Sequence, residues 1–76
     1  MSKERTDMVL GIEIYALCKN KPCSIDDLSG VLYKNNYAKN VVRVYRGIVT
    51  LLEYGLVVPV FKNRVLLFKA VDVKND

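Results

Sequence analysis

Histidine is absent from this 76-residue chain, and cysteine occurs only twice, at Cys18 and Cys23. Without imidazole the chain has no histidine ligand, general base or pH switch. Two cysteines are too few for a disulfide scaffold. The four glycines form neither a dinucleotide-binding loop nor a phosphate-cradling loop. We therefore expect no enzyme activity, no cofactor and no small-molecule substrate.

Long hydrophobic runs are also missing. The apolar stretch from Met8 to Cys18 is interrupted by Glu13 and is shorter than the roughly 20 apolar residues that a membrane-spanning helix needs. It leads to no small-residue cleavage site of the kind that follows a signal peptide. We expect no membrane partner and a cytoplasmic location.

Hydrophobic residues make up 51% of the chain and charged residues 26%, which is the balance of a folded protein. A chain of this length can bury one core at most. There are no linkers, repeats or low-complexity tracts. We expect a single domain over residues 1–76, with an ordered core at about 7–71.

Acidic side chains are nearly absent from the second half of the chain. Residues 1–33 carry four basic and five acidic groups, whereas residues 34–69 carry seven basic groups and the single acid Glu53. The net charge of the whole chain is +4. A basic surface of this kind favours an anionic partner, and this half of the chain is where we expect it to bind.

The first element is predicted to be a helix that Thr6 or Asp7 can cap and that ends before Lys21. One face is expected to point inward and comprises Met8, Val9, Ile12, Ala16 and Leu17. Further apolar residues lie on the other faces, namely Leu10, Ile14, Tyr15 and Cys18. One small core cannot bury a helix that is apolar all round. We therefore expect these four residues to form the interface of a homodimer, a common remedy for a small core.

Two more helices and a hairpin are expected to follow. Ser24 can cap the second helix, whose inner residues are Ile25, Leu28, Val31 and Leu32, and Asp26 and Asp27 suit its positive end. The third helix starts after Asn36 or at Asn40, and Gly55 ends it. Its predicted inner face is Tyr37, Ala38, Val41, Tyr45, Ile48 and Leu52, flanked by Val44, Val49 and Leu51.

After Gly55 the sequence is rich in β-branched and aromatic residues. Two strands, 56–61 and 65–71, are expected to pair across a turn at Lys62, Asn63 and Arg64. Asn63 tolerates the left-handed conformation that a tight turn needs. Pro59 cannot donate a backbone hydrogen bond, which places the first strand at an edge or a bulge. The fold class is mostly α with a β-hairpin (α+β).

This order of elements resembles the winged helix-turn-helix family, in which three helices are followed by a two-stranded wing. Residues 24–29, Ser-Ile-Asp-Asp-Leu-Ser, are similar to the Ser/Thr-x-x-Glu-Leu-Ala opening of that family's second helix. Residues 51–57, Leu-Leu-Glu-Tyr-Gly-Leu-Val, are similar to the Leu-x-x-x-Gly-Leu-Val segment that leads into the wing. The spacing between the two segments is several residues longer than in compact MarR-like members. In size the chain is more similar to minimal regulators of archaeal viruses and plasmids, and a viral protein would act in the host cytoplasm.

The third helix carries the candidate DNA-contacting residues, and the segment before it adds one more. These residues are Asn36, Lys39, Asn40, Arg43, Arg46 and Thr50. Arginine pairs with guanine through two hydrogen bonds, asparagine pairs with adenine, and lysine anchors phosphates. The plainer alternative is a solvated helix face, but such a face normally mixes both signs of charge. We expect sequence-specific binding to double-stranded DNA, with this helix in the major groove, as in a transcriptional regulator.

The hairpin tip adds Lys62, Asn63 and Arg64, which the resemblance implies lie near the flanking minor groove or its phosphates. The alternative function is a winged-helix module for protein–protein interaction that binds no DNA. For Cys18 and Cys23 we expect buried thiols and no metal site, since a zinc site would need ligands from another subunit. A disulfide between them is the alternative for a hyperthermophilic source.

Overall fold

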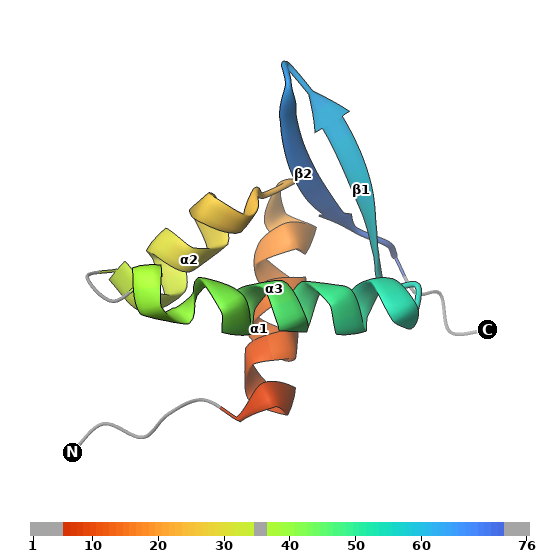
Figure 1. Cartoon of the computed structure of the whole chain (residues 1–76). Helices are drawn as coiled ribbons and strands as arrows, with labels where there is room; N and C mark the ends of the chain where they lie inside the picture. Colours follow the sequence, from red (N-terminus) through yellow and green to blue (C-terminus); the bar gives the residue numbers. More distant parts are fainter. Residues whose placement is uncertain (1–5, 35–36, 73–76) are drawn as a thin grey trace.

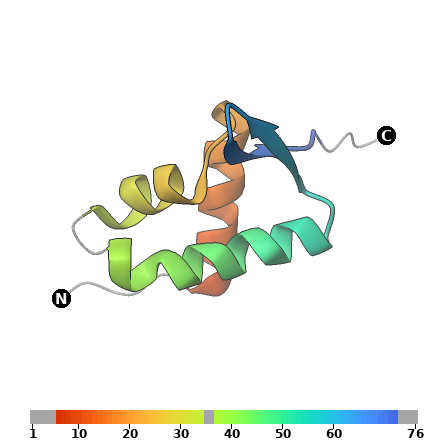
Figure 2. The ribbon, with the colours of Figure 1, turned by 45° about the horizontal axis from the view of Figure 1, so that its top comes forward.

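The computed structural model describes residues 6–34 and 37–72, with the backbone alone described at Tyr37. Within these residues the chain forms three helices followed by a two-stranded antiparallel hairpin, which confirms the α+β class (Figure 1). The elements are α1 (Asp7–Asn20), α2 (Ile25–Tyr33), α3 (Tyr37–Glu53), β1 (Val57–Lys62) and β2 (Val65–Ala70). Helix α1 lies behind α3 and crosses it, while α2 lies beside the first half of α3 (Figures 1 and 2).

Side-chain caps set the starts of the first two helices. The Thr6 side chain accepts a hydrogen bond from the Val9 amide and caps α1. At α2 the Ser24 hydroxyl accepts from the Asp27 amide at 3.0 Å, and the Asp27 carboxylate accepts from the Ser24 amide at 3.1 Å. This reciprocal pair is a capping box, and it satisfies two backbone donors that the helix start leaves without partners. The predicted cap at Ser24 is confirmed.

Helix α3 begins at Tyr37, so the later start at Asn40 is wrong. Its end is set by Gly55, whose φ of 71° is strained for residues with a side chain. The Leu56 amide donates to the Leu51 carbonyl, and the Gly55 amide donates to the Leu52 carbonyl. These two bonds form a Schellman motif, which satisfies carbonyls that the last helical turn leaves open. The predicted role of Gly55 is confirmed.

Replacing Gly55 with alanine is expected to destabilise the fold by about 1 to 2 kcal/mol, because an added Cβ disfavours the left-handed conformation. Apart from Gly55 itself and its two neighbours in the chain, no heavy atom lies within 4 Å of the position that this Cβ would take, so steric crowding does not enter. Urea unfolding followed by circular dichroism measures the change. An unchanged midpoint would show that the left-handed end of α3 is not needed.

The hairpin turns over two residues, Asn63 and Arg64, which have φ values of 51° and 66°. Two consecutive positive φ values define the type I′ turn that matches the natural twist of a hairpin. Asn63 behaves as predicted, whereas Arg64 takes a conformation that glycine normally occupies. Pro59 lies in β1, whose partner in the sheet is β2, and the predicted edge position of this strand is confirmed.

A short backbone bridge joins the α1–α2 connection to the hairpin. The Cys23 amide donates to the Phe68 carbonyl at 3.1 Å, and the Phe68 amide donates to the Cys23 carbonyl at 2.7 Å. Cys23 therefore pairs with the edge of β2 that β1 leaves open. Together with Val57, Phe68 and Ala70, which are buried, this bridge fixes the base of the hairpin to the helices.

The predicted inner and outer faces of α1 are exchanged in the structure. Leu10, Ile14 and Cys18 are almost completely buried and form part of the core, so they cannot form a dimer interface. Tyr15 is half-buried, and its hydroxyl donates to the Val71 carbonyl at 2.7 Å. The residues predicted to face inward are largely exposed: Met8, Val9, Ile12 and Ala16, while Leu17 is half-buried.

Gly47 lies where α1 and α3 approach each other. A Cβ at this position would come within 2.7 Å of the Ile14 side chain, so the glycine leaves room for Ile14 in the core. The buried face of α3 is centred on Val44, Ile48 and Leu51, which were predicted as flanks or as part of the stripe. On α2, Leu28 and Leu32 are buried as predicted, but Val31 is 58% exposed and does not face the core.

Candidate nucleic-acid interface

The solvent-facing side of α3 lies opposite its buried residues Val44, Ile48 and Leu51. We call it the outer face of α3, and it consists of the exposed residues Lys39, Val42, Arg46, Thr50 and Glu53. Their spacing of three or four residues places them along one side of the helix. Two cations lie in the first three turns, and the one acid lies at the last residue of the helix. The outer face is therefore cationic over most of its length.

Arg43 does not lie fully on this face. Its side chain is 26% exposed, and its guanidinium lies 3.6 Å from the carboxylate of Asp7 at the start of α1. Because Asp7 is 96% exposed, this ion pair is well solvated and contributes little to stability. The pair still holds the Arg43 charge toward α1. Of the two arginines predicted to contact DNA, Arg46 is the one that the structure places on the outer face.

Asn40 is half-buried and lies between the outer face and the core, so its side chain is less exposed than those of Lys39 and Arg46. Asn36, the other asparagine predicted to contact a base, lies outside the described residues. Thr50 is exposed on the outer face as expected. Of the six residues predicted on this helix and just before it, three therefore lie together on one exposed surface: Lys39, Arg46 and Thr50.

Three described apolar residues of α3 are exposed, which the sequence pattern did not indicate: Tyr45, Val42 and Ala38, the last of which was predicted on the inner face. Tyr45 is 54% exposed, although it was predicted on the inner face, and Val42 is 57% exposed. Compared with the predicted inner face, the observed buried face is rotated around the helix axis, away from Tyr45 and toward Val44 and Leu51. The apolar arc of this helix is wide, and tyrosine suits either the core or the surface, so periodicity alone could not fix its centre.

The hairpin tip presents a second cationic group. Lys62, Asn63 and Arg64 are all exposed, and the register pairs Lys62 with Val65 directly below the turn. Lys69 is exposed further down β2, and the two strands and their turn contain no acidic residue. The hairpin also carries an exposed aromatic side chain, Phe61. The tip is therefore basic and narrow, with apolar surface next to it.

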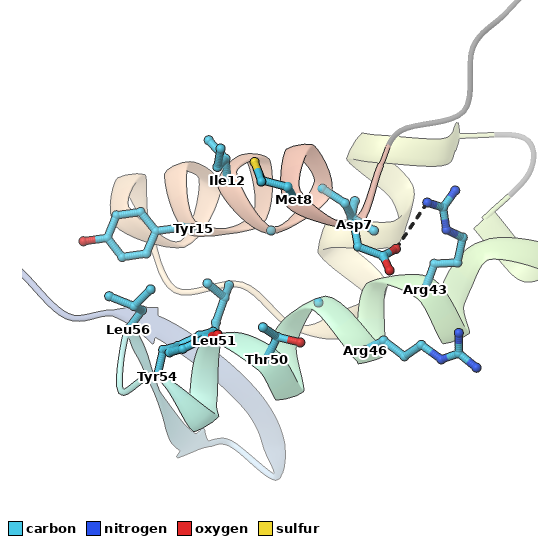
Figure 3. Close-up of a pocket in the computed structure, with 13 residues that line it drawn as sticks. Asp7, Met8, Ile12, Tyr15, Arg43, Arg46, Thr50, Leu51, Tyr54 and Leu56 are labelled. Carbon is cyan, nitrogen blue, oxygen red and sulfur yellow. Dashed lines mark ion pairs between the residues drawn. The ribbon is translucent and has the colours of Figure 1, made fainter.

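A groove of about 690 Å³ lies between α1 and α3 (Figure 3). Met8, Ile12 and Tyr15 line it from α1, and Arg43, Arg46, Thr50 and Leu51 line it from α3, with Tyr54 and Leu56 beyond the helix end. The lining is mostly apolar, and charged residues lie at the end near Asp7. Nothing in the sequence pattern predicted this groove, because it depends on how two helices cross.

The two cysteines are buried free thiols. Burial raises the pKa of Cys18 to about 11, and burial is also the main cause of the raised pKa of Cys23. Both are therefore neutral, weakly reactive thiols at physiological pH. Across residues 6–34 and 37–72, no cluster of three or more potential ligands that could hold a metal ion is found.

None of the helices in the described part of the chain combines the length and hydropathy that a bilayer crossing requires.

Comparison of the chain with protein-family models, with curated proteins and with solved structures finds no match.

Proposed function

We propose that the chain is a winged helix-turn-helix protein that binds double-stranded DNA in a sequence-specific manner and acts as a transcriptional regulator. In this proposal α3 enters the major groove and the hairpin contacts the flanking backbone. The observation that carries it is the cationic outer face of α3, with Lys39 and Arg46 exposed and no acid before Glu53.

The scaffold supports the winged-helix assignment in three ways. Three helices precede the hairpin, and Cys23 adds a strand position on β2 between α1 and α2. The capping box of Ser24 and Asp27 opens α2, and the following Leu28 and Ser29 are buried where the family motif has Leu-Ala. The Schellman turn at Gly55 leads directly into β1.

The distribution of charge supports a polyanionic partner. Six of the seven basic residues between positions 34 and 69 are exposed, and they include Lys39, Arg46, Lys62 and Arg64. Such residues supply the phosphate contacts that dominate affinity for DNA. Arg46, at the centre of the outer face of α3, is the best candidate for pairing with a guanine. Thr50 and Asn63 are candidates for further polar contacts.

A salt titration of binding to a duplex tests this function. For the full chain, the logarithm of the binding constant should fall linearly with the logarithm of salt concentration, with a slope of about −0.9 for each phosphate contacted. Fluorescence anisotropy of a labelled duplex measures it. Absence of binding at low salt would reject the DNA function and favour the protein-interaction alternative.

The double variant Lys62→Ala/Arg64→Ala is expected to weaken binding to every duplex alike. It should also make this slope shallower by about one unit for each phosphate that the variant no longer neutralises. The reason is that both cations lie at the exposed hairpin tip. The matched control is Lys21→Ala, an exposed cation between α1 and α2. If the slope of the double variant equals that of the control, the hairpin does not contact the backbone.

A further inference from the structure

One face of the hairpin is apolar along its length, and the helices cover only its base. Because side chains alternate along a strand, Val57, Phe68 and Ala70 share this face with Phe61 and Leu66, which are cross-strand partners. The first three are buried as part of the core. Phe61 is 73% exposed and Leu66 is 44% exposed, and the hairpin tip projects away from the helices (Figure 1). We call Phe61 and Leu66 the apolar pair of the hairpin.

The turn fixes where the apolar pair lies. Between the pair and the turn at Asn63 and Arg64, the register has one position, at which Lys62 faces Val65. Directly paired residues have Cβ atoms about 4.5 to 5.5 Å apart, so the phenyl ring and the leucine side chain form one projection. Side chains stand roughly perpendicular to a sheet. The apolar pair therefore points out from one face of the hairpin, close to its end.

The charges on the hairpin are all positive. Lys62 follows Phe61 in the chain, Arg64 lies in the turn, and Lys69 lies further down β2. All three are exposed, and residues 57–70 contain no acid. A partner that fits this surface must supply negative charge beside a place where an aromatic ring can be buried. The edges of a DNA groove carry phosphates, and the base steps between them can take up a ring.

The proposed function leaves the minor groove to the hairpin, because α3 enters the major groove. The minor groove of B-form DNA is about 6 Å wide. The backbones of two paired strands are themselves about 4.8 Å apart, so a hairpin with its side chains is too broad for an undeformed minor groove. A side chain that stands on the hairpin face can enter if the groove opens at one base step. Such an opening partly unstacks the step and kinks the duplex.

We propose that the apolar pair is a wedge that opens one base step from the minor groove, with the Phe61 ring inserted and Leu66 packed beside it. This inference rests on the proposed function and adds that the chain bends the DNA that it binds. Lys62 and Arg64 then contact the phosphates that flank the opened step, since their side chains are long and flexible. Pyrimidine–purine steps open most easily, so the wedge favours a site that contains one.

Binding of the full chain to two matched duplexes tests the proposal. One duplex is fully paired, and the other has the same sequence with a bulge of two unpaired thymines at its centre, which lowers the cost of a kink. The wild type is expected to bind the bulged duplex at least about tenfold more tightly, because less of the binding energy of the wedge is used for unstacking. Fluorescence anisotropy at one salt concentration measures both dissociation constants.

Phe61→Ala should reduce the ratio of the two dissociation constants to about one, because the variant no longer has the ring that enters the opened step. The matched variant Val58→Ala should leave the ratio unchanged, since Val58 is an exposed apolar residue of the same strand on the opposite face. Equal affinity of the wild type for the two duplexes, or equal ratios for the two variants, would overturn the wedge and leave DNA binding intact. No binding to either duplex at low salt would reject the proposed function and the wedge together.

A bend can also be measured directly on the paired duplex, with a fluorescent donor at one end and an acceptor at the other. Saturation with the wild type should increase energy transfer, and saturation with Phe61→Ala should increase it less. Unchanged energy transfer with the wild type bound would overturn the wedge.

Vesicles of phosphatidylserine test the other partner that combines negative charge with an apolar interior. If the wild type and Val58→Ala bind these vesicles, Phe61→Ala does not, and the wild type binds the two duplexes equally, the apolar pair belongs at a lipid surface and the proposal is wrong. If the wild type leaves the vesicles unbound and prefers the bulged duplex, the wedge is supported.

Discussion

The variant Ile14→Glu is expected to leave the chain unfolded at 25 °C, whereas Ile12→Glu, two residues earlier on the same helix, should keep its helical content. Ile14 is completely buried in the core between α1 and α3. Truncating a buried isoleucine already removes about 2 to 5 kcal/mol of stability, and an unpaired buried carboxylate adds to that loss. A domain of this size rarely has more than about 3 to 5 kcal/mol from its core.

Ile12→Glu is the control, because the Ile12 side chain is 63% exposed on the face of α1 opposite the buried Ile14. Circular dichroism at low protein concentration, followed by urea titration, separates the two variants. If Ile14→Glu were folded and Ile12→Glu unfolded, the result would indicate the opposite orientation of α1, in which Ile12 faces the core. The comparison therefore tests which face of the helix is buried.

The second large effect is expected at Arg46. Arg46→Ala should weaken binding at the preferred DNA site by roughly 1 to 3 kcal/mol if its guanidinium reads a guanine. Arg43→Ala should have the smaller effect, because the Arg43 guanidinium is held 3.6 Å from the Asp7 carboxylate. Competition binding with the preferred duplex and an unrelated duplex measures both losses.

Lys21→Ala serves as the control, since it removes one exposed cation far from α3 in sequence. A loss for Arg46→Ala that is equal on all duplexes would reassign Arg46 to a phosphate contact. No loss relative to Lys21→Ala would remove the outer face of α3 from the interface. Sequence specificity would then have to come from another part of the chain.

The ends of the helices and the turn of the hairpin could be predicted from the sequence because local chemistry sets them. Ser24 accepts from a nearby amide, Gly55 takes a positive φ, and Asn63 tolerates one. Each of these effects acts within a few residues of the chain. The element order and the α+β class followed from them, together with the change from helical periodicity to β-branched residues after Gly55.

The orientation of α1 could not be predicted in the same way, because hydrophobic periodicity measures a difference between faces and α1 is apolar on both. Leu10, Ile14 and Cys18 are spaced as regularly as Val9, Ile12 and Ala16. One signal in the sequence favours the observed orientation. Lys19 follows Ile12 by seven residues and continues its row, and a lysine is almost never fully buried. The close approach that Gly47 allows to Ile14 depends on the tertiary fold.

The candidate site was predicted in part. Lys39, Arg46, Thr50 and the three residues of the hairpin tip are exposed as expected. Arg43 was predicted on the same exposed face, but its partner Asp7 lies on another helix, and a contact between residues so distant in sequence has no local signal. Packing against α1 and α2 decides which face of α3 is buried, and it leaves Tyr45 exposed to solvent.

The most direct test of DNA binding is a chemical-shift titration of the ¹⁵N-labelled full chain with a short duplex. The proposed function predicts that amide shifts concentrate on the outer face of α3, at Lys39, Arg46 and Thr50, and at the hairpin tip. The amides of the exposed apolar residues of α1, namely Met8, Val9, Ile12 and Ala16, should change little. Shifts confined to these residues of α1, or no shifts at low salt, would contradict DNA recognition by α3.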